Sequence, residues 1–138
     1  MSIPDSLHLQ IIGTVDSPMK HRDECPLQGN EGAPEAIIKL EKEFLPAIAN
    51  LSIGEEIIVL TWMHLSKRDV LACFPRNEVH TPPLGVFSTR SPDRPNPIGL
   101  HRVRITSVKG ELIGVLPMEV VDGTPVIDIK PVINDSES

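Results

Sequence analysis

The sequence has 138 residues, 40% of them hydrophobic and 23% charged, which are ordinary values for one globular domain. Its net charge of −6 argues against an indiscriminate coat on nucleic acid, because such binding requires the neutralisation of many phosphates. The 14 prolines and the 3% aromatic content favour short strands joined by stiff turns over long helices. We expect one domain over residues 1–138, with its core at about 7–133.

The start of the chain has no basic region followed by an apolar stretch, so it predicts no signal peptide. Its apolar runs fall far short of the roughly 20 residues that cross a bilayer. The two cysteines, Cys25 and Cys73, stand in no regular framework, which favours reduced thiols inside a cell. We therefore expect a soluble, cytoplasmic protein without a membrane partner.

The first part of the chain predicts a strand, a long loop and an ambiguous segment. Residues 7–13 begin with alternating apolar and polar side chains, as in a first strand. Residues 17–34 are rich in Pro, Gly, Asp, Asn and charge, and loops of this length in compact domains are often functional. Residues 34–51 fit a helix that Pro34 opens, or a strand at 36–40 followed by a shorter helix. Periodicity alone does not decide between these two.

The second part predicts further strands and two tight turns. Residues 56–64 are β-branched and apolar, which indicates a strand buried on both faces. In the strand expected at 99–108, Val103 and Ile105 share one face and Arg102 and Arg104 the other. The turns are expected at Lys109-Gly110 and at residues 122–125, and the other strands at 83–89, 111–116 and 126–130. The pattern predicts an all-β fold, a small single-sheet β-barrel with one short helix.

Several common sites are excluded by missing motifs. The chain has neither a Gly-x-Gly-x-x-Gly loop nor a Gly-x-x-x-x-Gly-Lys-[Ser/Thr] loop, which argues against Rossmann and P-loop nucleotide sites. The histidines and cysteines lack the paired spacings of zinc ligands, and a loop does not fix the separation of His21 and Cys25. We expect no metal. A thiol nucleophile at Cys25 stays open, although it has no basic neighbour in sequence.

The segment from Gly85 to Leu100 carries most of the candidate chemistry. Three prolines within six residues fix φ and stiffen its backbone, which is how a small-molecule site is preorganised. The alternative is a structural connector whose arginines form surface pairs. The polar residues displayed on this frame are Arg90, Ser91, Asp93, Arg94 and Asn96.

Positive charge gathers in the same region of an otherwise acidic chain. Four arginines and His101 lie within fifteen residues, which is the expected footprint of a phosphate-bearing partner. An ordinary solvated strand face is the alternative for Arg102 and Arg104. The candidate contacts to such a substrate are Arg94, Arg102 and Arg104.

Long stretches of the sequence resemble the TsaA-like family, whose characterised bacterial members are the TrmO tRNA methyltransferases. The resemblance covers roughly residues 9–133, and the run through Leu100 is highly specific. Further matches are Ile12-Gly13 with Ser17-Pro18 and the Trp62-x-His64 strand. The matching motifs are Ser88-Thr89-Arg90-Ser91-Pro92, Arg94-Pro95-Asn96-Pro97-Ile98-Gly99-Leu100 and Asp122-Gly123-Thr124-Pro125-Val126-Ile127-Asp128-Ile129-Lys130-Pro131.

The resemblance implies a dimeric β-barrel that binds S-adenosyl-L-methionine. It also implies methyl transfer to the exocyclic nitrogen, N6, of the threonylcarbamoyl-modified adenosine just 3′ of the tRNA anticodon. Carried over by position, the cofactor contacts are Pro26, Leu27, Gln28, Met63, His64, Arg90, Leu100, Asp122, Gly123, Thr124 and Pro125. The catalytic candidates are Asp93, His64 and Asn96, with Asp122 as a further acceptor for the departing proton. Arg90 and Arg94 suit carboxylate or phosphate contacts.

Two departures from the family pattern bear on the substrate. Leu27 replaces the arginine of a Pro-Arg-Gln loop, so a side-chain role there is lost. The longer bacterial enzymes carry a C-terminal domain thought to help hold tRNA, whereas this sequence stops at Ser138. Alternatives are therefore methylation of a small molecule or another RNA, and a non-catalytic module that binds S-adenosyl-L-methionine.

Overall fold

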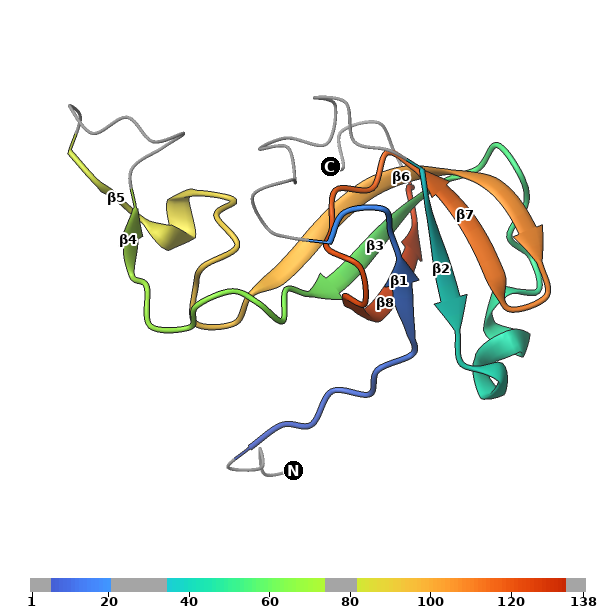
Figure 1. The fold of residues 1–138 in the computed structure, drawn as a ribbon, viewed down its shortest axis with the longest axis horizontal. Helices are drawn as coiled ribbons and strands as arrows, with labels where there is room; N and C mark the ends of the chain where they lie inside the picture. Colours follow the sequence, from blue (N-terminus) through green and yellow to red (C-terminus); the bar gives the residue numbers. More distant parts are fainter. Residues whose placement is uncertain (1–5, 21–34, 74–81, 134–138) are drawn as a thin grey trace.

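Six antiparallel strands form a sheet that closes on itself into a barrel, in the order β1-β2-β7-β6-β3-β8 (Figure 1). The structure is a computed structural model, and it describes residues 6–20, 35–73 and 82–133. The predicted all-β barrel is confirmed. The strands are β1 (Gly13–Asp16), β2 (Ala36–Leu40), β3 (Glu56–Trp62), β6 (Ile98–Lys109), β7 (Leu112–Leu116) and β8 (Pro125–Pro131).

The pairing of β1 with β8 closes the barrel. Gly13 lies opposite Val126, and the amide of Ile12 donates to the Val126 carbonyl at 2.9 Å. Alternate side chains point inward, so Val103 and Ile105 are 1% exposed while Arg104 on the other face is exposed, as predicted. The interior is filled by aliphatic side chains, among them Val15, Ile38, Ile57, Val59, Ile113, Val115, Met118, Val120 and Val126.

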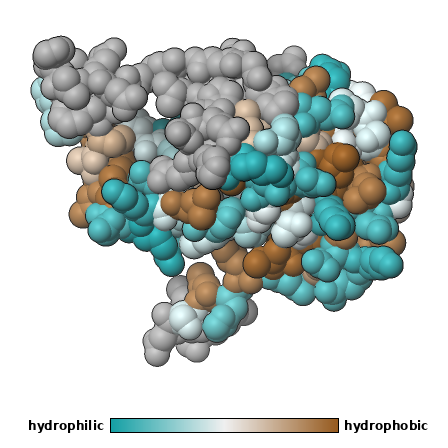
Figure 2. All heavy atoms as spheres, viewed as in Figure 1, coloured by the Kyte–Doolittle hydropathy of each residue, from teal (hydrophilic) through white to brown (hydrophobic). Residues whose placement is uncertain are grey.

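The prediction of a first strand at residues 7–13 is wrong for all but its last residue. β1 begins at Gly13, and the preceding segment runs out from the barrel (Figure 1). β2 ends at Leu40, opposite Gly13, and no described residue before Ile12 pairs with β2 or with β8, although β8 continues to Pro131. Leu7 is consequently 76% exposed, and brown surface is visible on this projecting segment (Figure 2).

Residues 34–51 adopt the second of the two predicted arrangements. Ala36–Leu40 is a strand whose side chains alternate between buried and exposed, and a 3-10 helix, η2 (Lys42–Ile48), follows it. Pro46 lies inside η2, where its missing N–H does not favour a regular α-helix. No helix within the described ranges combines the length and the apolar character needed to span a membrane.

The strand predicted at residues 83–89 is wrong beyond Gly85. β5 (Leu84–Gly85) pairs with β4 (Ala72–Cys73) in a separate two-stranded sheet, outside the single sheet that forms the barrel. A 3-10 turn, η4 (Val86–Ser88), then follows. The physical reason is that the Thr89 amide donates back to the Val86 carbonyl at 3.0 Å, which turns the chain while Val86 is buried.

Both predicted turns are confirmed, and each depends on a glycine with positive φ. Gly110 has φ of 59° between β6 and β7, and Gly123 has φ of 85° just before β8. The expectation that residues 56–64 are buried on both faces is confirmed for Ile57, Ile58 and Val59.

The antiparallel order gathers three connections at one end of the barrel, which we call the loop end. Adjacent antiparallel strands point in opposite directions, so β1, β3 and β7 end where β2, β6 and β8 begin. The connections that start there are residues 17–35, 63–97 and 117–124. The helix η2 and the β6–β7 turn lie at the opposite end.

Candidate functional site

The loop end brings together most of the residues that the sequence singled out. Met63 and His64 directly follow β3, Leu100 is the third residue of β6, and residues 122–125 lead into β8. The connection from β3 to β6 carries Arg90, Asp93, Arg94 and Asn96. Pro26, Leu27 and Gln28 belong to the connection between β1 and β2 but lie outside the described residues. Segments distant in sequence therefore leave the barrel at a common end.

Two residues that sequence reasoning missed hold residues 89–97, which we call the proline-rich loop, and Lys67 is the first. Its backbone amide donates to Asp93 Oδ1 at 2.8 Å, and its carbonyl accepts the Arg94 amide at 3.0 Å. Asp93 thus joins the loop to the segment that follows β3. This contact supports the structural role that the sequence left open for this carboxylate.

Arg68 is the second of these residues and makes three contacts. Its guanidinium lies over the Trp62 ring at 5.0 Å, a cation–π distance. Its Nε donates to the Pro95 carbonyl at 2.7 Å, and one of its terminal nitrogens donates to Asn96 Oδ1 at 3.0 Å. Arg68 stands in no recognisable motif, so no sequence signal pointed to it. The predicted catalytic candidate Asn96 is therefore held by Arg68.

Arg94 points back into the loop. Its guanidinium donates to the backbone carbonyls of Val86 and Thr89 and is partly buried. A guanidinium engaged with two carbonyls braces the turn η4 and offers little to a phosphate. The side chain of Arg90 is exposed.

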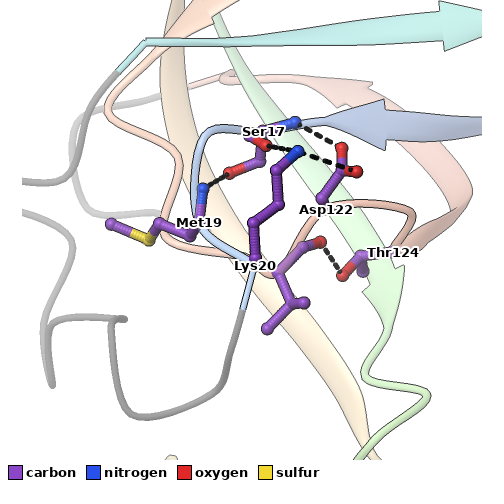
Figure 3. Close-up of polar contacts among 6 residues, drawn as sticks. Ser17, Met19, Lys20, Asp122 and Thr124 are labelled. Atoms are coloured by element: carbon purple, nitrogen blue, oxygen red, sulfur yellow. Dashed lines mark hydrogen bonds and ion pairs between the residues drawn. The ribbon is translucent and has the colours of Figure 1, made fainter.

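Asp122 anchors the beginning of the β1–β2 connection (Figure 3). Its Oδ1 accepts the Ser17 amide at 2.9 Å, and its Oδ2 lies 3.1 Å from Lys20 Nζ. The Ser17 amide first, and the Lys20 ammonium second, hold the pKa of this carboxyl below its usual value. A carboxylate stabilised in its ionised form is a weak acceptor for a departing proton, which disfavours Asp122 as the general base.

The rest of the turn at 122–125 is also joined to β1 and the residues after it. The Asp122 amide donates to the Met19 carbonyl at 2.6 Å, and the Gly123 amide to the Val15 carbonyl at 2.7 Å. Within the turn, the Thr124 hydroxyl donates to the Val121 carbonyl at 2.6 Å (Figure 3). These bonds fix the start of the connection that carries residues 26–28.

The two arginines of the β6 outer face are paired with a carboxylate. Arg102 Nε lies 2.8 Å from Glu56 Oε2, and Arg104 lies 3.6 Å from Glu56 Oε1 and donates to the Gly54 carbonyl at 2.9 Å. The hydrogen bond and charge of Arg102, with the charge of Arg104, hold the pKa of Glu56 below its usual value. Glu56 therefore partly neutralises the basic surface expected from the sequence.

Beside these arginines, the outer face of β6 carries exposed apolar side chains. Ile98 is 42% exposed and Leu100 is 39% exposed, and they lie opposite Trp62 and Leu60 of β3. Leu100 thus faces away from the barrel interior and towards solvent, at the loop end. Exposed apolar side chains beside polar loops suit the aromatic part of a ligand.

A hollow of about 620 Å³ lies at the opposite end of the barrel. It is rimmed largely by side chains of both charges and contains none of the predicted site residues. Its lining residues are Thr14, Lys39, Leu40, Glu41, Lys42, Glu43 and Glu111. The candidate functional residues and this hollow therefore occupy different ends of the molecule.

Residues 6–20, 35–73 and 82–133 offer few side chains for metal binding or for thiol chemistry. Those ranges contain no group of three or more His, Cys, Asp or Glu residues able to hold a metal ion. Cys73 is a free, partly buried thiol whose Sγ lies 3.7 Å from Thr89 Oγ1. His21 and Cys25, the pair weighed from the sequence, lie outside the described residues.

The fold and the loop end define a small closed β-barrel with its candidate functional residues gathered at one end. The model of the tRNA-methyltransferase O N-terminal domain matches residues 14–138. The chain therefore belongs to that family.

Two archaeal relatives are similar over most of the chain. A probable S-adenosyl-L-methionine-binding protein of Methanothermobacter thermautotrophicus is 41% identical over 132 residues, which are 96% of this chain and 94% of that protein. An S-adenosyl-L-methionine-binding protein of Archaeoglobus fulgidus is 41% identical over 122 residues, which are 88% of this chain and 86% of that protein.

Two longer proteins match in part. The crystal structure of TrmO from Pseudomonas aeruginosa superposes with a TM-score of 0.75 at 26% identity, covering 96% of this chain and 59% of that chain. This chain thus spans about three fifths of the TrmO chain. A mouse tRNA (adenine(37)-N6)-methyltransferase is 52% identical over 54 residues, which are 39% of this chain and 12% of that protein.

The lowered pKa of Asp122 predicts an acid-dependent stability contribution. Because the folded pKa lies below the unfolded value of about 3.9, the contribution is present above that value and is lost as pH falls through the folded pKa. We expect Asp122→Asn to reduce the free energy of unfolding at pH 7 and to match the wild type once pH is well below 3.9.

Urea unfolding measured from pH 7 down to the acid limit of folding tests this expectation. Lys20→Gln is the matched variant, and it should retain part of the effect because the Ser17 amide still stabilises the carboxylate. A stability difference between Asp122→Asn and wild type that stays constant across this range would contradict the assignment.

The contacts of Arg68 predict that Arg68→Ala loosens the proline-rich loop without unfolding the barrel. Because Arg68 is exposed, we expect a stability change of less than about 1 kcal/mol. The amides of Arg94 and Ile98, which donate to the carbonyls of Lys67 and Asn96, should exchange several-fold faster with deuterium. Arg104→Ala is the control and should leave these amides unchanged. Equal exchange in Arg68→Ala and wild type would show that Arg68 does not hold the loop.

Proposed function

We propose that the chain binds S-adenosyl-L-methionine at the loop end and transfers its methyl group to an adenine in tRNA. The observation that supports this most strongly is the convergence of the family motifs there. The segments at 63–64, 88–100 and 122–125 are far apart in sequence, yet the antiparallel order carries all of them to the loop end. The family match and the names of the archaeal relatives supply the ligand.

The described residues have the chemistry that S-adenosyl-L-methionine requires. Its adenosyl group needs apolar surface, which Ile98 and Leu100 expose on the outer face of β6. Its carboxylate needs a donor, and the exposed guanidinium of Arg90 suits that task. The hydrogen bond and ion pair of Asp122 hold the start of the β1–β2 connection in place, so the turn at 122–125 stabilises one side of the proposed binding site.

S-Adenosyl-L-methionine, when bound, supplies an activated methyl group whose bond to sulfur breaks as the new bond to nitrogen forms. The chain's main task is to hold the acceptor nitrogen in line with this bond, since alignment alone supplies on the order of 7–11 kcal/mol. A protein group must also accept the proton that leaves the adenine nitrogen. Holding the two reactants and accepting this proton are the two tasks required of the loop end.

His64 suits the proton better than the other candidates. Asp93 and Asn96 are engaged by Lys67 and Arg68, and Asp122 is stabilised in its ionised form. The His64 side chain is exposed, and no hydrogen bond from it to any other described residue is found. In the proposed mechanism His64 takes the proton, and the engaged residues keep the loop in shape.

The acceptor in the proposal is the N6 atom of threonylcarbamoyl-adenosine beside the anticodon. The name of the mouse relative, which specifies adenine 37 and N6, supports this choice. Arg102 and Arg104 would contact tRNA phosphates, with their residual charge after pairing with Glu56. An enzyme of this kind would work in the cytoplasm, where tRNA is modified.

The proposal includes a homodimer, as the family resemblance implies. Large apolar side chains are exposed on the described surface and are available for such a contact. Leu7, Leu71 and Phe87 are 76%, 69% and 82% exposed in the isolated chain. Sedimentation velocity would reveal a species of twice the chain mass, and a monomer at all concentrations would remove this part of the proposal.

Binding is tested by calorimetry with Arg90→Ala. Loss of one charge-assisted contact should weaken the affinity for S-adenosyl-L-methionine about ten- to hundredfold, with the melting temperature unchanged. Arg104→Ala, which removes an exposed arginine of the β6 outer face, is the matched control and should bind as the wild type does. An unchanged affinity in Arg90→Ala would refute the assignment of that residue.

The reaction is tested with purified protein, S-adenosyl-L-methionine and tRNA that lacks the methyl group. Nucleoside mass spectrometry should find methylated threonylcarbamoyl-adenosine with the wild type, and a rate at least about tenfold lower with His64→Ala. Binding without turnover on any tRNA pool would identify a non-catalytic module instead. Turnover on another acceptor would keep the methyltransferase and replace its substrate.

A further inference from the structure

A network of polar contacts lies inside the barrel next to the loop end. His101 Nε2 is 2.9 Å from Thr61 Oγ1, and that hydroxyl donates to Met63 Sδ at 3.3 Å. Thr61 is 0% exposed and His101 is 7% exposed, so this network is shielded from water. It connects adjacent strands, since Thr61 lies on β3 and His101 on β6.

Glu119 lies next to this network, at the other edge of the His101 ring. Its Oε1 lies 3.7 Å from His101 Nδ1, which is close for charge but long for a hydrogen bond. Within the described part of the chain, His101 Nδ1 and Glu119 Oε2 are buried and have no hydrogen-bond partner. Buried polar atoms of this kind are costly and rare, and the exceptions concentrate at functional sites.

The contact between Thr61, His101 and Met63 is fixed by close packing against Gly99. A Cβ atom at Gly99 would lie 2.6 Å from Thr61 Oγ1, 2.7 Å from His101 Nε2 and 3.0 Å from Met63 Sδ. The three polar atoms thus meet at the β6 backbone, one residue before Leu100. Only a glycine leaves room for them there.

Met63 is held at its backbone as well as at its sulfur. Its amide donates to the Pro97 carbonyl at 2.8 Å, and its carbonyl accepts the Ser66 amide at 2.9 Å. A methionine side chain is otherwise adaptable, because it has three rotatable bonds. The Thr61 hydroxyl therefore adds the restraint that selects one orientation of the Met63 side chain.

We propose that Thr61, held by its contact with His101, is a positioning residue that holds the Met63 side chain ready for S-adenosyl-L-methionine. This inference rests on the proposed function, in which Met63 and His64 contact the ligand at the end of β3. Thr61 itself touches no ligand. Its effect passes through the sulfur of Met63.

The test compares Thr61→Val, which removes the hydroxyl, with Thr61→Ser, which keeps it. Calorimetry with S-adenosyl-L-methionine should show about three- to tenfold weaker binding for Thr61→Val, as expected for one hydrogen bond. Thr61→Ser should restore affinity to within about twofold of the wild type. Thr106→Val is the matched control. The Thr106 hydroxyl is also buried and has no partner among the described residues, and Thr106 lies on β6 farther from the loop end than His101 does.

A double-mutant cycle separates positioning from general destabilisation. Met63→Leu keeps the side-chain volume but removes the sulfur acceptor, so Thr61→Val should cause no further loss of affinity in that background. The methyl ¹³C shift of Met63 in the ligand-free protein should move in Thr61→Val and stay in Thr61→Ser. If Thr61→Val does not fold, His101→Gln replaces it in the cycle, because this change removes the imidazole that contacts the Thr61 hydroxyl.

The outcomes distinguish this inference from the proposed function. Wild-type protein that does not bind S-adenosyl-L-methionine would refute the proposed function and with it the ligand assigned here. If the wild type binds S-adenosyl-L-methionine and Thr61→Val binds it with equal affinity, the positioning role alone is refuted. The same holds if Thr61→Val loses as much affinity in the Met63→Leu background as it does when Met63 is present. Loss confined to the background that retains the sulfur would support it.

Discussion

The pairing of β1 with β8 is the constraint on which the remainder of the structure depends. It closes six antiparallel strands into a barrel, so each of those strands pairs with a neighbour on both sides. It also determines which connections share an end, because each strand must run opposite to both of its neighbours. The three connections that carry the family motifs leave from that one end, although they begin near residues 17, 63 and 117.

Two kinds of support give the loop end a defined shape. The salt bridge from Asp122 to Lys20 and the hydrogen bond that Asp122 accepts from the Ser17 amide tie the β7–β8 turn to the residues after β1. The guanidinium of Arg68, stacked on Trp62, ties the proline-rich loop to the residues after β3. Most of the polar side chains that look catalytic in the sequence are used in this support, whereas Arg90 and His64 are exposed at the loop end.

The regular parts of the fold could be predicted because local signals and burial agree. Alternation in β6 identified the inward position of Val103, and Gly110 and Gly123 marked turns that require positive φ. The first strand was misplaced because alternation at Leu7 does not reveal whether that segment pairs with a neighbouring strand. Arg68 was missed because its partners, Pro95 and Asn96, are brought to it only by the tertiary fold.

A crystal structure with S-adenosyl-L-methionine tests the central claim most directly, because it locates the sulfur relative to the two ends of the barrel. The account predicts the ligand at the loop end, against the outer side chains of Ile98 and Leu100 and beside the turn at 122–125. Ligand in the charged hollow at the opposite end, lined by Lys39 and Glu111 among others, would contradict it.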